Sequence, residues 1–211
     1  MLSILQGIPS DQLTAMGCQL LSLMSGVLFY HVFHTKYSST NTRHLISLTI
    51  GLTVAILCYK TSFIHLLLLC LLSYTVLLYV PVGFRGWLTF ALCFGHVLLV
   101  HLDSYVNHYM EFRVEISNSL MVLASKVSYT AFSLDDNFKR SKLTPNQVKY
   151  KLTATPTFFE YFSYCFCFLG ILFGPCYHFS EYMSFIRGDQ YKEKWPAVSS
   201  TCYNYHFSVS Y

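Results

Sequence analysis

Long stretches without a charged side chain constrain this sequence more than any other feature. Asp, Glu, Lys and Arg are absent from the ranges 12–35, 61–84, 86–102 and 161–180, which are 24, 24, 17 and 20 residues long. A helix needs roughly 20 apolar residues to cross a bilayer. Only 11% of the residues are charged, whereas a soluble domain carries about 25%. The sequence therefore predicts a polytopic integral membrane protein and excludes an ordinary water-soluble enzyme.

The charge-free ranges, together with a shorter one at 44–59, define five predicted spans. We place these spans at 13–34, 45–59, 63–80, 86–102 and 157–179. All five should be helices, because lipid offers backbone groups no other hydrogen-bond partner. The links at 60–62 and 80–85 are so short that we expect the helices they join to be antiparallel neighbours.

A different pattern fills the interval between the fourth and fifth spans. Apolar residues recur there every three or four positions, which predicts one apolar face of a helix: Ile116, Leu120, Leu123, Val127, Ala131 and Leu134. The opposite face is polar, so this helix should lie along the membrane surface or pack against the bundle. The fold class is therefore all-α, a transmembrane helical bundle of about five spanning helices plus one amphipathic helix.

Two capping signals follow. Thr144 and Gln147 stand three apart with Pro145 at the first helical position, which predicts a short helix that continues to Leu152. Thr155 and Pro156 are expected to start the fifth span by the same device.

Basic residues gather in the connection before the fifth span: Lys139, Arg140, Lys142, Lys149 and Lys151. By the positive-inside tendency this connection should be cytoplasmic, with the N-terminus on the same side. The cluster is too short and too close to the membrane for nucleic-acid binding. It suits anionic lipid headgroups or the phosphates of a nucleotide-bearing substrate.

Cysteine and histidine are frequent, with eight and nine residues. Six cysteines fall inside apolar segments, where small hydrophobic residues explain them, and their spacing is not that of a zinc site: Cys18, Cys58, Cys70, Cys93, Cys165 and Cys167. Histidines inside or beside the spans are favoured as interfacial or hydrogen-bonded structural residues over ligands. No metal is predicted.

The stretch from Phe158 to Ile186 is the most unusual in composition, since aromatic residues run into Gly174-Pro175. Pro175 cannot donate a backbone hydrogen bond, and Gly174 allows another backbone to come close, so the pair should kink the fifth span. A purely structural bend and the lining of a cavity are both consistent with this kink.

Several motifs in linear order resemble one family. The amphipathic segment SLMVLASKVSYTAFSLDD, the linker LTPNQ and the stretch TPTFFEYFSYCFCFLGILFGPCYHFSEYMSFIRG are similar to the membrane-bound O-acyltransferase (MBOAT) family, in its lysophospholipid acyltransferase branch. The likeness is strongest over 119–188. Residues 1–188 are thus expected to form the N-terminal part of an MBOAT-type transmembrane domain, and 189–211 a divergent polar and aromatic tail.

This resemblance implies a multi-pass enzyme of the endoplasmic reticulum membrane that acts in phospholipid remodelling. It would transfer a fatty acyl group from acyl-CoA to the hydroxyl of a lysophospholipid, with acyl-CoA as co-substrate and no other cofactor. Lysophosphatidylethanolamine and lysophosphatidylserine are the favoured acceptors. The family-motif residues expected to line a substrate tunnel are Glu160, Tyr161, Gly174, Pro175 and Tyr182.

Family members carry a catalytic asparagine and histidine in their C-terminal half, downstream of the Gly-Pro span. None of the nine histidines here occupies that slot, so we carry over no catalytic residue and expect a chain truncated before the catalytic half. One alternative is a non-catalytic membrane regulator or pseudoenzyme with a membrane protein partner. Another is a small transporter or haem-binding membrane protein that uses His65 and His96.

Overall fold

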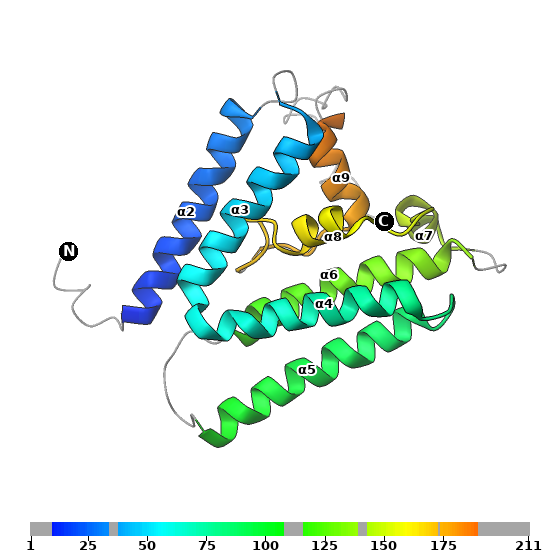
Figure 1. Ribbon diagram of the computed structural model, residues 1–211, viewed down its shortest axis with the longest axis horizontal. Helices are drawn as coiled ribbons and strands as arrows, with labels where there is room; N and C mark the ends of the chain where they lie inside the picture. Colours follow the sequence, from blue (N-terminus) through cyan, green and yellow to red (C-terminus); the bar gives the residue numbers. More distant parts are fainter. Residues whose placement is uncertain (1–9, 34–37, 108–115, 139–142, 173, 190–211) are drawn as a thin grey trace, which may run out of the picture.

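The computed structural model describes residues 10–33, 38–107, 116–138, 143–172 and 174–189. Within these ranges the regular structure is entirely helical. Two long helices run side by side along one flank, three others cross at a wide angle to them, and short helices lie between the two sets (Figure 1). The all-α membrane fold predicted from the sequence is confirmed.

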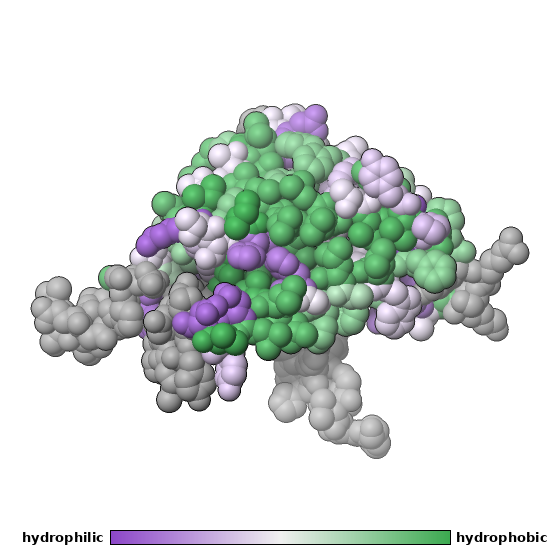
Figure 2. Space-filling model, turned by 60° about the horizontal axis from the view of Figure 1, so that its bottom comes forward, coloured by the Kyte–Doolittle hydropathy of each residue, from purple (hydrophilic) through white to green (hydrophobic). Residues whose placement is uncertain are grey.

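Four helices match the first four predicted spans within a few residues. They are α2 (Ser10–Val32), α3 (Thr40–Tyr59), α4 (Phe63–Tyr79) and α5 (Arg85–Asn107). In the described part of the chain, three stretches are long and apolar enough to cross a membrane: Gln12–Val32, Thr40–Tyr79 and Arg85–Asn107. The face shown in Figure 2 is mostly hydrophobic, with hydrophilic residues in small groups, as suits contact with lipid.

The two short links behave differently. Between α3 and α4 the helix η1 (Lys60–Ser62) makes a corner, and Lys60 adopts a left-handed φ of 48°. The two helices diverge from this corner and touch only beside it (Figure 1), so the expectation of antiparallel neighbours is wrong at this link. A three-residue helical link continues the chain outward and does not reverse it. α4 and α5 do pack side by side.

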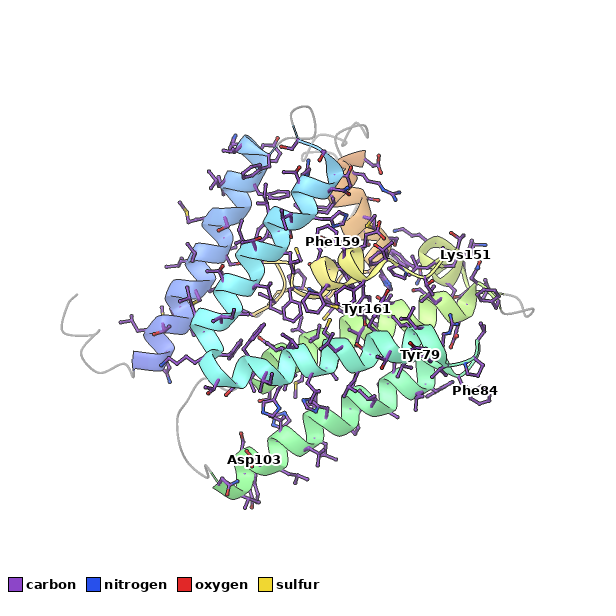
Figure 3. The ribbon with its side chains drawn as sticks, in the orientation of Figure 1. Tyr79, Phe84, Asp103, Lys151, Phe159 and Tyr161 are labelled. Atoms are coloured by element: carbon purple, nitrogen blue, oxygen red, sulfur yellow. The ribbon has the colours of Figure 1, made fainter. Side chains whose placement is uncertain are left out.

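The C-terminal end of α6 (Ser117–Asp136) is hydrogen-bonded to the turn between α4 and α5. The Asp135 carboxylate accepts hydrogen bonds from the backbone N–H groups of Gly83 and Gly86, at 2.9 and 2.8 Å. Gly83 has a φ of 96°, a conformation that only glycine adopts without strain. Tyr79 and Phe84 mark this turn in Figure 3, and Asp103 lies toward the far end of α5.

The predicted amphipathic helix is α6, and it packs inside the bundle. All six residues of its predicted apolar face are at most 8% exposed. Its contacts with α5 are the most extensive between any two elements described. The polar residues Lys126 and Ser128 are buried as well, so α6 is a central element and does not lie on the membrane surface.

The expected short helix is α7 (Pro145–Tyr150), and its capping box between Thr144 and Gln147 is confirmed. Lys151 follows this helix (Figure 3). The backbone N–H of Leu152 donates to the Ser133 carbonyl of α6 at 3.0 Å, which attaches the connection to the bundle.

The fifth predicted span is wrong as a single helix. Its residues form α8 (Phe158–Cys165) and an irregular stretch, after which α9 (Phe179–Arg187) begins. The cap of α8 is Thr157, whose side chain accepts from the Glu160 backbone, and not Thr155. Pro175 lies in the irregular stretch, so it kinks no helix.

The backbone of the irregular stretch finds partners on neighbouring helices. The Ser22 hydroxyl of α2 donates to the Phe168 carbonyl, and the Ser119 hydroxyl of α6 donates to the Leu172 carbonyl at 2.9 Å. Non-helical backbone at membrane depth is tolerated where protein groups satisfy it. Much of the described segment 161–172 is therefore buried between the two sets of long helices.

Candidate functional site

A cavity of about 320 Å³ opens between the irregular stretch and α9. It has six lining residues: Cys167, Leu169, Tyr177, Glu181, Tyr182 and Phe185. The walls are mainly apolar and aromatic, with one charged side chain and two phenols among these six residues. Small-molecule sites are commonly cavities of this kind, at about 300 to 1,000 Å³.

The Tyr182 wall is held by α3 and α8. The Tyr182 hydroxyl lies 3.0 Å from Nδ1 of His44 and is hydrogen-bonded to the Ser163 hydroxyl. Ser163 also donates to the His44 carbonyl at 3.0 Å. All three residues are at most 2% exposed, and burial raises the pKa of the Tyr182 phenol far above its usual range. Tyr182 is therefore a neutral, rigidly placed wall.

The Tyr177 wall is held by a buried lysine. Nζ of Lys126 lies 3.2 Å from the Tyr177 hydroxyl and 4.5 Å from the centre of its ring. A second aromatic face, Tyr164, lies 5.6 Å from the same nitrogen. Lys126 is fully buried, and burial lowers its pKa. The described contacts of Lys126 are with phenols and aromatic faces, so cation–π contact takes the place of the usual carboxylate.

Glu181 ties the cavity to α7. One carboxylate oxygen accepts from the Tyr150 hydroxyl at 3.0 Å, and the other accepts from the backbone N–H of His178 at 3.0 Å. The His178 ring stacks on Tyr150, with centroids 3.8 Å apart, and on Tyr129. Burial lowers the pKa of His178, while Glu181 raises it and Lys149 lowers it further.

Arg43, next to His44 in the chain, fixes α9 from the other side. Its guanidinium donates to the Phe185 carbonyl at 3.1 Å and lies 4.9 Å from the ring centre of Phe29. The cavity wall formed by α9 is thus clamped to α2 and α3. A rigid wall of this kind can orient a ligand without first ordering itself.

The five residues predicted to line a tunnel lie in different environments in the structure. Tyr182 lines the cavity, and Glu160 instead accepts from the Thr157 backbone at the start of α8. Tyr161 lies between α8 and α4, where its hydroxyl is 2.9 Å from Ser73 (Figure 3). Gly174 lies so close to the backbone of Leu169 and Gly170 that a Cβ on Gly174 would be 2.3 Å from the Leu169 carbonyl oxygen and from the Gly170 Cα. Pro175 is exposed.

Sequence reasoning missed three important residues: His44, Lys126 and Tyr177. Histidines beside the spans were expected to be interfacial or hydrogen-bonded structural residues, and His44 is buried and hydrogen-bonded, but its contact with Tyr182 was not predicted. Lys126 lies on the face of α6 that the sequence predicts to be polar, and it is the only charged residue between Glu115 and Asp135. A single charge within such a helix is a signal that could have pointed to an internal partner.

His65 and His96 meet between α4 and α5, with ring centres 5.5 Å apart. In the described part of the chain, Nδ1 of His65 and Nε2 of His96 are buried without a hydrogen-bond partner. No cluster of three or more metal-ligating side chains exists among the residues that the structure describes. The seven cysteines described are free thiols, five of them buried.

Comparison with known proteins finds similar acyltransferases but no matching family model. No protein-family model matches the chain. Membrane-bound glycerophospholipid O-acyltransferase 1 of Mus musculus is 30% identical over 190 residues, which are 89% of this chain and 39% of that relative.

Membrane-bound glycerophospholipid O-acyltransferase 2 of Gallus gallus is 27% identical over 188 residues, which are 88% of this chain and 36% of that relative. Lysophospholipid acyltransferase 6 of Drosophila melanogaster is 29% identical over 184 residues, 86% of this chain and 26% of that relative. The chain thus spans less than two fifths of the length of these relatives. Over most of its length, the chain is thus a homologue of lysophospholipid acyltransferases of the membrane-bound O-acyltransferase family.

Proposed function

We propose that this chain forms part of an enzyme that transfers a fatty acyl group from acyl-CoA to the hydroxyl of a lysophospholipid. The observation that carries the proposal is the similarity over 86–89% of the chain to proteins named as glycerophospholipid O-acyltransferases and a lysophospholipid acyltransferase. In this reaction the lipid oxygen attacks the thioester carbon, the C–S bond breaks, and CoA leaves with the hydroxyl proton. Acyl-CoA is a co-substrate, and no prosthetic group is needed.

The geometry favours a role for this chain in binding a ligand and in holding the walls of its cavity. A cavity lined by aromatic groups is backed by a buried network in which His44, Ser163 and Tyr182 hold one another. We assign the general base to no residue of the chain, because the described histidines make structural contacts or lie apart from the cavity lining. The proposal includes a multi-pass position in the endoplasmic reticulum membrane.

A segment exchange tests the function. The aligned segment of the mouse relative is replaced by this chain, and transfer of labelled oleate from oleoyl-CoA to a panel of lysophospholipids is measured in acyltransferase-deficient membranes. The relative without the segment is the matched control. We expect the exchanged protein to transfer acyl groups and the deleted one to be inactive. A well-expressed exchanged protein without transfer contradicts the proposal and favours a non-catalytic regulator.

The same assay with the 211 residues alone locates the base. We expect no transfer. Transfer would place the base within this chain, and substitution of His65, His96, His101 and His178 would then identify it.

The haem or transport alternative depends on the His65–His96 pair, since the two rings adjoin and each has a buried ring nitrogen without a described partner. A Soret band in the purified chain that disappears in His65→Ala would support it. A colourless preparation would contradict the haem form of this alternative.

A further inference from the structure

The cavity under α9 has a carboxylate in one wall and a buried lysine behind another. Glu181 is the only charged residue among the six that line it. Lys126 lies directly behind a second lining residue, Tyr177. A ligand that matched only one charge would leave the other poorly compensated, and buried charges are costly without a partner. The two walls together favour a ligand that carries both charges.

The Tyr177 wall suits an acceptor oxygen. An ammonium has three donors and no acceptor, so the Tyr177 hydroxyl must accept from Lys126 when that lysine is charged. The phenolic proton is then left for another acceptor. Its neighbour Cys167 offers only a thiol sulfur, which is a weak acceptor. A phosphate oxygen placed here would receive a strong hydrogen bond close to a buried cation.

The Glu181 wall suits a cation. Each carboxylate oxygen receives one hydrogen bond, from Tyr150 or from the His178 backbone, and a carboxylate has about four acceptor positions. The aromatic rings of Tyr182 and Phe185 line the same cavity. An ammonium is attracted both to a carboxylate and to the faces of aromatic rings.

We propose that this cavity is a subsite for the phosphate–ammonium headgroup of a lysophospholipid. The phosphate lies against the Tyr177 hydroxyl in front of Lys126, and the ammonium lies against the Glu181 carboxylate and the rings of Tyr182 and Phe185. Glu181 then determines specificity for headgroups that carry an ammonium. This inference rests on the proposed function, and it adds the residues that read the headgroup.

Direct binding tests the subsite without any acyl transfer. The full 211-residue chain is purified in an uncharged maltoside detergent and titrated with three radiolabelled lipids. Lysophosphatidylethanolamine carries phosphate and ammonium, lysophosphatidic acid carries phosphate alone, and an 18-carbon alkylamine carries ammonium alone. We expect lysophosphatidylethanolamine to bind about tenfold more tightly than either of the other two, since each charge contact is worth about a factor of ten.

Two variants separate the two walls. Glu181→Gln should weaken lysophosphatidylethanolamine about tenfold and leave lysophosphatidic acid no weaker, so the preference disappears. Tyr177→Phe should weaken both phosphate-bearing lipids by similar factors and keep their ratio. Thermal unfolding of each variant checks that the fold is retained.

The chain contains a matched control for Glu181. Glu160 also occupies the third position of a short helix and accepts the backbone N–H of the capping residue, but it does not line the cavity. Glutamine can serve in the same capping position. Glu160→Gln should therefore leave the binding order of the three lipids unchanged.

Three results would overturn the subsite. They are absence of saturable lysophosphatidylethanolamine binding, equal affinities of the wild-type chain for the three lipids, and an equal effect of Glu160→Gln and Glu181→Gln on selectivity. Failure here is distinct from failure of the proposed function. An exchanged protein that transfers acyl groups without dependence on Glu181 would refute the subsite alone.

Discussion

Helix α5 and the segment Phe158–Arg187 look alike in sequence and differ completely in structure. Both contain long charge-free ranges, 86–102 and 161–180. α5 is one helix of 23 residues with a largely unburied apolar surface. The other segment breaks into α8, an irregular stretch and α9, and residues such as Tyr164 and Phe166 are fully buried. An apolar run of spanning length therefore predicts removal from water, and it does not by itself predict a crossing.

The difference comes from what surrounds each segment. Isolated in lipid, a chain must satisfy its own backbone, which forces a helix. The irregular stretch is surrounded by α2, α3, α4 and α6. The hydroxyls of Ser22 and Ser119 donate hydrogen bonds to its backbone carbonyls, which a helix would otherwise satisfy internally. The Tyr164 hydroxyl does the same for the Tyr177 carbonyl at 2.7 Å. Protein partners thus substitute for helical hydrogen bonds.

The largest expected effect is on membrane topology, when a charged residue is introduced into each of the two segments. Leu98, near the middle of α5, is 48% exposed, and Leu169 lies in the irregular stretch. An arginine at a helix centre costs about 2.5 to 3.5 kcal/mol on insertion scales. Leu98→Arg should therefore give mixed topology, as seen by glycosylation of acceptor sites placed in the loops. Leu169→Arg should keep one topology, and mixed topology in both variants would show that the fifth segment crosses after all.

A pair of glycines tests how closely the broken segment is packed. A Cβ on Gly51 of α3 would lie 1.7 Å from the Phe166 carbonyl oxygen, whereas a Cβ on Gly95 of α5 would meet nothing within 4 Å. Gly51→Ala should lower the free energy of unfolding by about 3 kcal/mol, as overpacking against backbone does. Gly95→Ala should leave it unchanged or raise it by up to about 1 kcal/mol. Thermal unfolding in detergent measures both, and equal effects would mean that α3 and the irregular stretch are not in contact.

Local signals in the sequence were sufficient for much of this fold. The first four spans, the capping box at Thr144 and the periodic face of α6 each depend on neighbours within a few residues, and each is found as predicted. The break after Cys165 depends on hydroxyls donated by residues 50 to 150 positions away. No local pattern contains that information, so the fifth span could not be recognised as broken.

The candidate site was less predictable for the same reason. Tyr182 was named from a family motif, but its partners His44 and Ser163 come from α3 and α8. Lys126 and Tyr177 are 51 positions apart and meet only because α6 lies beneath the irregular stretch. Sequence identified the segment that carries the cavity, and only the tertiary arrangement identified which side chains face one another.

A smaller effect concerns the attachment of α8 to α4. Tyr161 is fully buried and hydrogen-bonded to Ser73 at 2.9 Å, whereas Tyr79 is 83% exposed (Figure 3). Tyr161→Phe should cost about 1 kcal/mol, the usual net value of a buried hydrogen bond. Tyr79→Phe should change the free energy of unfolding by less than about 0.5 kcal/mol. Chemical unfolding followed by circular dichroism can compare them, and a neutral Tyr161→Phe would remove this bond from the stabilising contacts.

A pH-dependent effect is expected at the start of α9. Burial lowers the pKa of His178 below 6.5, so the folded chain binds fewer protons than the unfolded chain in the window beneath that value. Stability should therefore fall as the pH is lowered from 7.5 to 5. His178→Phe keeps a ring to stack on Tyr150 and Tyr129 but cannot titrate. Its melting temperature should depend less on pH than that of the wild type, and identical pH profiles would contradict the assignment.

The smallest effect on stability is expected at Pro175, for which the sequence predicts a central structural role. Pro175 was predicted to kink a spanning helix, in which case Pro175→Ala would straighten that helix and disturb the site. In the structure Pro175 is exposed and lies outside any helix, four positions before α9 begins. Its replacement should change the free energy of unfolding by about 0.5 to 1 kcal/mol at most, through the greater freedom of the unfolded chain. Lipid binding by the cavity should be unaltered in the same titration. A large loss of stability or binding would restore the kinked fifth span and remove the contrast with α5.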